Sequence, residues 1–169
     1  MGLVYLTGTS GVGKTTVGAE LRRRGFTVYD VDADGLARWF ENASGAEVSL
    51  PSERGDAWYA ENTYRLPVDT VRRLATRAGT TFICGTVGND NEIWDLFDKV
   101  IHLTVDTPTL ERRLLRRGTF GSSPDELRRV LAWSTQADVD NARYGAHLIP
   151  ATGSPEQIAA EILEALGDP

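Results

Sequence analysis

Residues 8–15 read Gly8-Thr9-Ser10-Gly11-Val12-Gly13-Lys14-Thr15, and this is the most informative stretch of the sequence. It matches the pattern G-x-x-x-x-G-K-[S/T], in which glycines let backbone N–H groups turn inward around phosphate oxygens without a Cβ in the way. An apolar run, Leu3 to Leu6, comes directly before it, and a helical pattern begins at Lys14. The sequence therefore predicts a strand, a phosphate-binding loop and a helix in succession.

Two side chains of the loop indicate a nucleotide and its metal ion. Lys14 can reach the β- and γ-phosphates, and the Thr15 hydroxyl can ligate Mg²⁺. Lys14 and Lys99 are the only lysines among 18 basic residues, so a lysine here is informative, because the site needs a compact point charge on a flexible stem. We therefore expect ATP and Mg²⁺ as cofactors. The nucleotide-binding candidates of the loop are Gly8, Thr9, Ser10, Gly11, Val12, Gly13, Lys14, Thr15 and Thr16.

The length and composition predict one globular domain over residues 1–169. The chain is 41% hydrophobic and 25% charged, which is ordinary for a globular protein. The formal net charge of −6 has the wrong sign for a nucleic-acid-binding surface, so no nucleic-acid partner is expected. Cys84 is the one cysteine, and the apolar start at Leu3 is too short for a signal segment or a membrane span. We therefore expect a cytoplasmic protein without disulfides and without a membrane partner.

Short β-rich apolar runs alternate with helical patterns along the chain, which is typical of βαβ units on a parallel sheet. The predicted strands cover residues 3–6, 26–31, 80–84, 100–105 and 147–149. The predicted helices cover residues 14–24, 34–41, 67–78, 90–97, 107–117, 124–140 and 154–166, and residues 42–55 are expected to form a loop between helices. Two helix starts carry explicit caps, Ser123-Pro124 and Ser154-Pro155, each followed by a capping-box residue. The predicted fold class is α/β.

Several motifs together resemble the P-loop kinases of small metabolites and nucleotides, the group that contains shikimate, gluconate, adenylate and dephospho-coenzyme A kinases. Asp30-Val31-Asp32 is similar to the D-x-D of shikimate and gluconate kinases, and residues 31–38 are similar to the D-A-D-x-x-A-R of dephospho-coenzyme A kinases. Residues 97–117 resemble the whole group, and Gly85 to Asn89 resembles a turn of small shikimate kinase-like proteins. The resemblance implies a three-layer α/β/α P-loop kinase fold with a mostly parallel five-stranded sheet and a short lid.

Three carboxylates, Asp30, Asp32 and Asp34, follow the second predicted strand. The carboxyl end of a strand in an open α/β sheet faces the ligand crevice. There, one carboxylate can position the hydration shell of Mg²⁺, and another can accept the proton of an attacking hydroxyl. By resemblance, Asp30 serves the metal together with Thr15, and Asp32 is catalytic and binds the substrate, with Asp34 a rival for that second role. The alternative is that Asp32 or Asp34 only caps a helix that begins at Gly35.

The third predicted strand, Phe82-Ile83-Cys84, runs into Gly85 and Thr86 rather than into an aspartate. This speaks against motor ATPases and switch GTPases, which hold Mg²⁺ with an aspartate at that point. Shikimate kinases present a glycine turn to the substrate there, so the resemblance makes Gly85, Thr86 and Asn89 candidates for the substrate site. A plain polar turn is the alternative.

The pattern Leu110-x-x-Arg113-Leu114-x-x-Arg117 resembles the segment that leads into the lid of these kinases. Arg113 and Arg117 are four residues apart and share one helical face. We expect Arg113 on the nucleotide and Arg117 as a catalytic residue that neutralises charge on the transferred phosphate, although sequence alone leaves the two roles interchangeable. A solvated arginine-rich surface helix is the alternative. The lid is expected over about residues 117–124.

The segment between the second and third predicted strands, about residues 34–66, carries substrate specificity in this group. It contains Arg54, Trp58 and Arg65, together with Tyr59 and Tyr64. Aromatic rings with arginines can sandwich a base or grip a carboxylate or phosphate, and equally they can pack under a loop. The substrate-binding candidates of the whole chain are Asp32, Asp34, Arg54, Trp58, Arg65, Gly85, Thr86 and Asn89.

The two histidines, His102 and His147, fall in or beside predicted strands. Neither has metal-ligand spacing, and both are expected to be structural. The same expectation holds for Cys84, which lies in an apolar strand.

The sequence thus predicts an ATP-dependent kinase that transfers the γ-phosphoryl group to a small-molecule substrate. A nucleoside or nucleotide is the expected substrate, because the aromatic rings at positions 58, 59 and 64 can stack on a base. Three alternatives remain open: a shikimate-like or natural-product hydroxyl, a dephospho-coenzyme A-like substrate, and a non-catalytic ATP-binding regulatory module.

Overall fold

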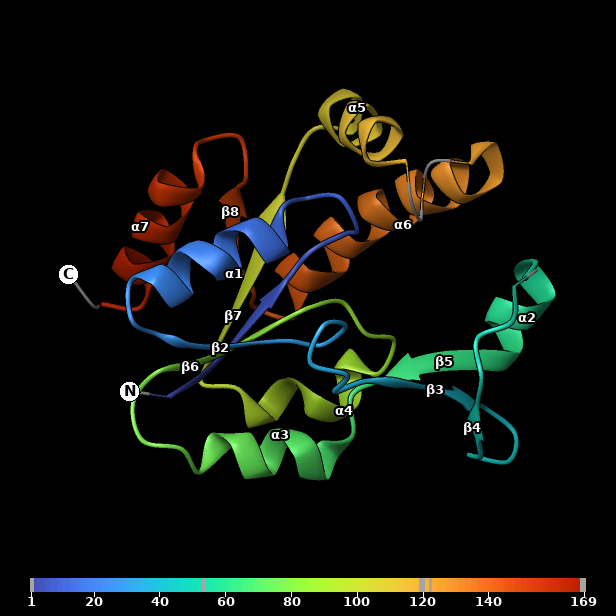
Figure 1. The fold of residues 1–169 in the computed structure, drawn as a ribbon, viewed down its shortest axis with the longest axis horizontal. Coiled ribbons are helices and arrows are strands. Elements are labelled where there is room, and N and C mark those ends of the chain that lie inside the picture. The colour runs from blue at the N-terminus through green and yellow to red at the C-terminus, as the bar shows by residue number, and fades with distance from the viewer. Residues whose placement is uncertain (1, 53, 119–120, 122, 168–169) are drawn as a thin grey trace.

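The computed structural model describes residues 2–52, 54–118, 121 and 123–167. The strands of its main sheet are β1 (Leu3–Thr7), β2 (Thr27–Asp30), β6 (Thr81–Cys84), β7 (Lys99–Thr104) and β8 (His147–Pro150). All five run parallel, in the order β2-β6-β1-β7-β8 (Figure 1). This confirms the predicted α/β fold with a five-stranded sheet.

Helices cover both faces of this sheet, which makes three layers (Figure 1). One face carries α1 (Lys14–Arg23) and α7 (Pro155–Ala165), and the other carries α3 (Val68–Ala75) and α4 (Asp90–Ile93), which continues as a 3₁₀ turn over Trp94–Leu96. After β7 come α5 (Thr107–Arg117) and α6 (Pro124–Arg143), of which α6 packs against β7. Among the described residues, no helix combines the length and the apolar character needed to cross a membrane.

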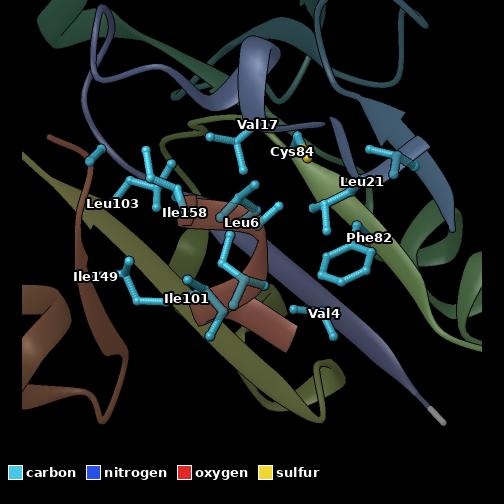
Figure 2. Close-up of a cluster of buried hydrophobic side chains, with 14 of the residues drawn as sticks. Val4, Leu6, Val17, Leu21, Phe82, Cys84, Ile101, Leu103, Ile149 and Ile158 are labelled. Atoms are coloured by element: carbon cyan, nitrogen blue, oxygen red, sulfur yellow. The ribbon is translucent and has the colours of Figure 1, made fainter. Parts of the chain in front are cut away.

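The alternation of side chains along β1 divides the core between the two faces of the sheet. Val4 and Leu6 point toward α1 and α7 and belong to the buried cluster of Figure 2, while Leu3 and Tyr5 point toward α3. All of β1 is buried, as is typical of a central parallel strand covered on both faces. The central strand therefore holds the loop that follows it in a fixed position.

The predicted helix over residues 34–41 is wrong. Arg38–Glu41 forms strand β3, which pairs antiparallel with β4 (Glu47–Val48) on one side and β5 (Asn62–Arg65) on the other. The physical reason is cross-strand packing, because Trp39 lies opposite Tyr64 with the ring centroids 5.2 Å apart, and aromatic residues favour a half-buried strand.

This correction removes one alternative for the carboxylates after β2. Residues 31–35 form a turn that leads, through Gly35 with its positive φ of 61°, directly toward β3. No helix begins there, so neither Asp32 nor Asp34 caps one.

The expectation of a loop between two helices over residues 42–55 is also wrong. This segment contributes β4 and connects β3 to α2 (Asp56–Glu61), which runs directly into β5. We call residues 38–65, which comprise β3, β4, α2 and β5, the arm, because they project from the main sheet (Figure 1).

The remaining predicted elements agree with the structure within a few residues. The predicted helix 90–97 is shorter, since only residues 90–93 are α-helical and 94–96 form the 3₁₀ turn, whereas α6 continues three residues past its predicted end to Arg143. Both predicted N-caps are confirmed, because Ser123 accepts a hydrogen bond from the Glu126 N–H and Ser154 forms a full capping box with Gln157. The Glu126 carboxylate accepts from the Gly121 N–H instead of closing a capping box.

The turn after β6 joins the arm to the main sheet. Asn89 Nδ2 donates to Leu66 O at 3.0 Å, and Leu66 N donates to Asn89 Oδ1 at 2.9 Å. Beside this pair, Gly88 N donates to Tyr64 O at 2.7 Å. Asn89 is only 2% exposed, so its amide replaces water for the backbone at the end of the arm.

Replacing Asn89 by alanine is expected to lower the free energy of unfolding by about 2–3 kcal/mol, because the Leu66 N–H and C=O lose their partners in a buried place. Denaturant unfolding followed by circular dichroism measures the difference. Asn91 is exposed and provides the matched control, since Asn91→Ala is expected to stay within about 0.5 kcal/mol of wild type. An Asn89→Ala variant as stable as this control would show that the amide does not hold the arm.

Candidate functional site

The loop between β1 and α1 has the backbone conformation that its glycines permit. Gly8, Gly11 and Gly13 have φ values of 142°, 88° and 118°, a region that residues with a Cβ rarely adopt. A Cβ at Gly13 would meet only the Arg113 guanidinium at 4.0 Å, so the backbone conformation, rather than crowding, requires glycine there. The loop ends at the N-terminus of α1, whose free N–H groups favour an anion.

Lys14 lies folded over the loop. Its Nζ donates to Gly8 O at 2.5 Å and to Thr9 O at 3.1 Å. Burial lowers the pKa of this amine to about 8, and the carboxylates of Asp32 and Asp30 oppose that effect. The amine is therefore still mostly protonated at neutral pH, with few partners other than carbonyl oxygens to compete with a phosphate.

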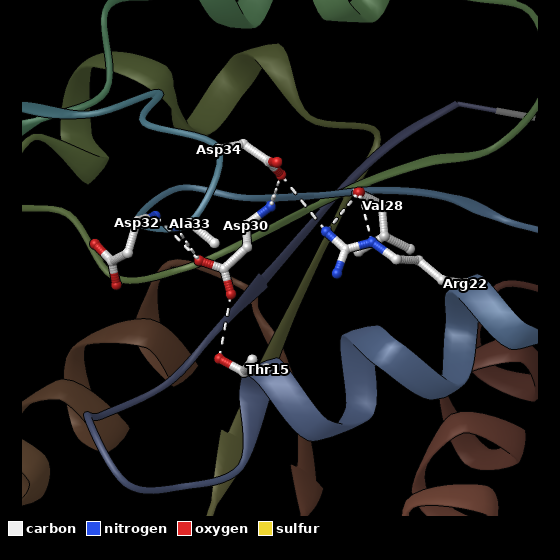
Figure 3. Close-up of polar contacts among 7 residues, drawn as sticks. All are labelled: Thr15, Arg22, Val28, Asp30, Asp32, Ala33 and Asp34. Carbon is white, nitrogen blue, oxygen red and sulfur yellow. Dashed lines mark hydrogen bonds and ion pairs between the residues drawn. The ribbon is translucent and has the colours of Figure 1, made fainter.

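Asp30 connects the end of β2 to the start of α1. The Thr15 hydroxyl donates to Asp30 Oδ2 at 3.1 Å, and Asp30 Oδ1 accepts from the Asp32 and Ala33 N–H groups at 3.0 and 3.1 Å (Figure 3). A hydroxyl beside a held carboxylate, next to a phosphate-binding loop, is a donor set that suits Mg²⁺, which is bound by one or two oxygen side chains plus phosphates and water. The residues present thus fit the expected metal.

Asp32 and Asp34 point in different directions (Figure 3). Asp32 lines the cleft described below, and its Oδ1 accepts from the Tyr64 hydroxyl at 2.7 Å. Asp34 instead accepts from the Asp30 N–H at 2.8 Å and from Arg22 at 3.5 Å, and it does not line the cleft. The geometry therefore favours Asp32 over Asp34 as the carboxylate that contacts the substrate. Burial and this bond raise the pKa of Tyr64 well above its ordinary value, so the phenol stays a donor.

The two candidate arginines of α5, Arg113 and Arg117, also have different surroundings. Arg113 donates to Val12 O at 2.7 Å and to Ala151 O at 2.8 Å, so it braces the phosphate loop against the residues that follow β8. Arg117 lines the cleft at the end of the helix. Beyond it, the predicted lid begins with Gly118, which ends α5 with a φ of 64°, and Gly121 N donates to Glu126 at 3.1 Å. The other lid positions 119, 120 and 122 lie outside the described residues.

One cleft of about 1120 Å³ runs from the phosphate loop to the arm and α6. Its nucleotide end is lined by Gly8, Thr9, Ser10, Gly11, Gly13, Lys14, Thr15 and Thr16, whereas Val12 is buried and faces away from it. Thr86 lies at the junction and donates to Gly8 O at 2.5 Å. A single site for a drug-sized ligand usually has about 300–1,000 Å³, so the cleft has room for a nucleotide and a second small molecule.

The predicted substrate residues divide into two groups. Asp32, Arg54 and Thr86 line the cleft, but Asp34, Trp58, Arg65, Gly85 and Asn89 do not. Trp58 packs on Trp39 with centroids 4.6 Å apart, and Arg65 pairs with Glu92. Gly85 lies against Val31, where an added Cβ would come within 2.0 Å of the valine side chain. The geometry therefore favours structural roles for Trp58, Arg65 and Gly85. It also favours a structural role for Asn89, whose amide bonds to the backbone of Leu66.

Several cleft residues escaped the sequence analysis. Trp133, Ala137 and Asn141 line the cleft from α6, and their spacing of four residues was a usable signal of one helical face. Asp90, directly after Asn89, and His102, in the middle of β7, also line it. Trp39 was not a candidate, because the sequence prediction placed it in a helix over residues 34–41 that does not form. The full set of cleft-lining residues is therefore apparent only from the tertiary structure.

Comparisons with known proteins agree with this fold. The sequence model of the AAA domain family matches residues 4–131. Shikimate kinase 2 of Enterobacter sp. (strain 638) is 29% identical over 176 residues, which cover 96% of this chain and 94% of that protein.

Solved structures share the fold at low sequence identity. Shikimate kinase from Acinetobacter baumannii, solved in complex with shikimate, superposes with a TM-score of 0.68 at 19% identity, covering 98% of this chain and 93% of that one. A gluconokinase from Sinorhizobium meliloti superposes with a TM-score of 0.58 at 18% identity, covering 98% and 91% of the two chains. The family match over most of the chain shows that this protein belongs to the AAA domain family, and the chain is similar in sequence to a shikimate kinase and shares the fold of P-loop kinases.

Proposed function

We propose that this protein, a P-loop phosphotransferase, transfers the γ-phosphoryl group of ATP to a hydroxyl group of a small substrate that carries a flat ring. The observation that carries the proposal is one continuous cleft, which joins a phosphate-binding loop to an aromatic-walled chamber with Asp32 between them. The two ends of the cleft can hold two reactants, and Asp32 lies where it can activate the attacking hydroxyl.

The chain's own groups divide the work of such a transfer. The loop N–H groups, Lys14 and the N-terminus of α1 hold the phosphates, and Arg117 neutralises negative charge at the reacting end. Mg²⁺, held by Thr15 and Asp30, would supply further charge neutralisation. Asp32 orients the attacking hydroxyl and accepts its proton, while Tyr64 keeps the carboxylate in place.

The aromatic wall supports a ring-bearing substrate. Trp39, Tyr59, Tyr64 and Trp133 all line the cleft, from the arm on one side and α6 on the other. Their contacts are close: Trp39 and Tyr59 have centroids 5.8 Å apart, as do Tyr59 and Trp133. Such rings stack on any flat π-system, so a nucleoside, the substrate class expected from the sequence, suits this wall.

A shikimate-like ring alcohol is the second candidate, because the curated relative that matches nearly the whole chain is a shikimate kinase. A carboxylate substrate needs a cation in the chamber, and Arg54 is the lining arginine of the arm. Its guanidinium, however, already donates to the Tyr59 hydroxyl at 2.8 Å and to Pro51 O at 3.1 Å, and lies 3.6 Å from Glu126. These partners favour the nucleoside over the carboxylate.

The direct test is ADP release from MgATP, measured alone and with pools of nucleosides, nucleoside monophosphates, cyclic polyols including shikimate, or dephospho-coenzyme A. The nucleoside pool is expected to raise the rate well above a Lys14→Ala blank, because only that pool combines a hydroxyl and a flat ring in a molecule without an anionic group. Stimulation by the polyol pool alone would favour the second candidate. ATP binding without stimulation by any pool would favour the regulatory module.

Asp32→Asn is expected to lower kcat with the stimulating pool by about 10²–10⁴-fold, the usual contribution of a general base. Asp34→Asn is the matched control, because Asp34 lies two residues away and outside the cleft, and its kcat is expected to stay within about tenfold of wild type. Steady-state ADP release measures both, and calorimetry checks that each variant still binds ATP. Equal losses in the two variants would contradict the role given to Asp32.

The affinity for a non-hydrolysable MgATP analogue is expected to fall about tenfold between about pH 7 and about pH 9. The pKa of Lys14 is lowered to about 8, so the amine loses its charge, and its attraction for phosphate, across this interval. Isothermal titration calorimetry at a series of pH values measures the effect. Lys14→Ala is expected to bind weakly with a flat profile, and an equally steep profile in that variant would assign the titration to another group.

A further inference from the structure

The chamber has a polar floor on the side of the sheet that faces α6. Tyr5 and Thr7 of β1 alternate onto this side, and His102 of β7 pairs with Thr7 across the two strands. Asp90 follows β6, and Asn141 comes from α6. We call Asp90, His102 and Asn141, which all line the cleft, the polar floor.

His102 offers a hydrogen-bond acceptor without a partner. Its side chain is 1% exposed, and Nε2 lies 2.7 Å from the Asp138 carboxylate, so Nε2 carries the proton that this bond requires. Burial lowers the pKa of the imidazole below its ordinary value, which keeps the ring neutral. Nδ1 is then a lone pair, buried, with no hydrogen-bond partner among the described residues.

Asn141 offers a second such atom. Its Nδ2 donates to Ala137 O at 2.8 Å, which orients the amide and leaves Oδ1 at the other end. Oδ1 is buried and has no partner in the described part of the chain. Of the three buried side-chain atoms in this condition there, two therefore belong to residues that line one cleft, and buried polar atoms of this kind call for an explanation.

Asp90 offers a third acceptor. Its Oδ1 accepts from the Tyr5 hydroxyl at 3.1 Å, the one donor to this carboxylate in the described residues. Burial raises the pKa of Asp90 to about 6, so the group is ionised at neutral pH but poorly solvated. The Asp138 carboxylate, which bonds to His102, brings a second negative charge, and the Lys14 ammonium acts on the same imidazole from the nucleotide end.

The cations around the chamber are already engaged. Arg54 has the partners described above, and Arg129 of α6 bonds to Asp56 and lies over the Tyr59 ring at 4.7 Å. Lys14 and Arg117 stand at the nucleotide end of the cleft. The floor therefore presents two acceptor atoms without a partner in the described residues and a carboxylate with a single donor, while the cations around the chamber already have other partners.

We propose that the polar floor binds a hydrogen-bond-donating nitrogen of the phosphoryl-accepting substrate, an amino or carboxamide group, and rejects carboxylate and phosphate groups. This deepens the proposed function and rests on it only for the identification of the chamber as the substrate site. A donating group can form hydrogen bonds with His102 Nδ1 and Asn141 Oδ1 and interacts favourably with the negative charge of Asp90. A carboxylate would leave all three unpaired and add repulsion.

Benzamide and benzoate provide the test, since they share a flat ring and a similar size and differ in whether the polar group donates or is an anion. Ligand-detected NMR titration of the full chain with MgADP measures both affinities without requiring turnover. Benzamide is expected to bind at least about tenfold more tightly, as for other sites built to pair with a donor. Equal affinities, tighter benzoate binding or no binding of benzamide would overturn the proposal.

Asn141→Leu separates a binding role from a structural one. It removes a buried atom that lacks a partner, so the variant is expected to unfold at the wild-type temperature or above while the preference for benzamide shrinks. A lower unfolding temperature with the preference intact would identify Asn141 as structural and overturn its place in the floor.

Asp90→Asn is the second variant and keeps the size of the side chain. It turns one acceptor into a group that also donates, so the difference between benzamide and benzoate is expected to narrow. An unchanged difference would exclude Asp90. Because these measurements need no phosphoryl transfer, a failed ADP-release assay with intact benzamide selectivity would refute the proposed function alone, and the reverse result would refute the polar floor alone.

Discussion

The parallel pairing of β1 with β6 on one side and β7 on the other is the constraint on which the rest of the structure depends. Because the strands are parallel, their carboxyl ends meet at one edge of the sheet. The phosphate loop after β1, the carboxylates after β2 and the Gly85 turn after β6 are thereby brought to the same place. The apolar side chains that bury β1 on both faces keep the loop from shifting relative to these neighbours.

The arm and α6 complete the site from outside the main sheet. The arm is held by Asn89 and Gly88, and its contacts with α6 run through Arg129 and Tyr59. The nucleotide end is thus built from contiguous backbone, whereas the substrate end is built from two separate elements that meet over the sheet. Such an arrangement lets one phosphate-binding core serve different substrates, because changes in the arm or α6 leave the loop untouched.

The sequence predicted the five strands, most helices and both serine caps, since each rests on a local pattern that the core reinforces. The helix expected over residues 34–41 failed because a short segment with two aromatic residues does not reveal its partner, and Trp39 finds Tyr64 only across a strand pair. Within the site, Arg113 and Asn89 illustrate the same limit. Both residues stand out in the sequence, but their bonding partners are distant in the chain. Arg113 bonds to the carbonyls of Val12 and Ala151, and Asn89 bonds to the backbone of Leu66.

The phosphate loop, with Lys14 and Thr15, follows from the sequence alone, because the eight residues of the motif carry both the glycine conformations and the polar groups. The tertiary structure alone decided which carboxylate faces the cleft, which aromatic rings form its wall and which polar atoms form its floor. The reason is physical: the φ values of a glycine loop are local properties. The direction and burial of Asp32, Trp133 or His102 depend on elements that only folding brings together.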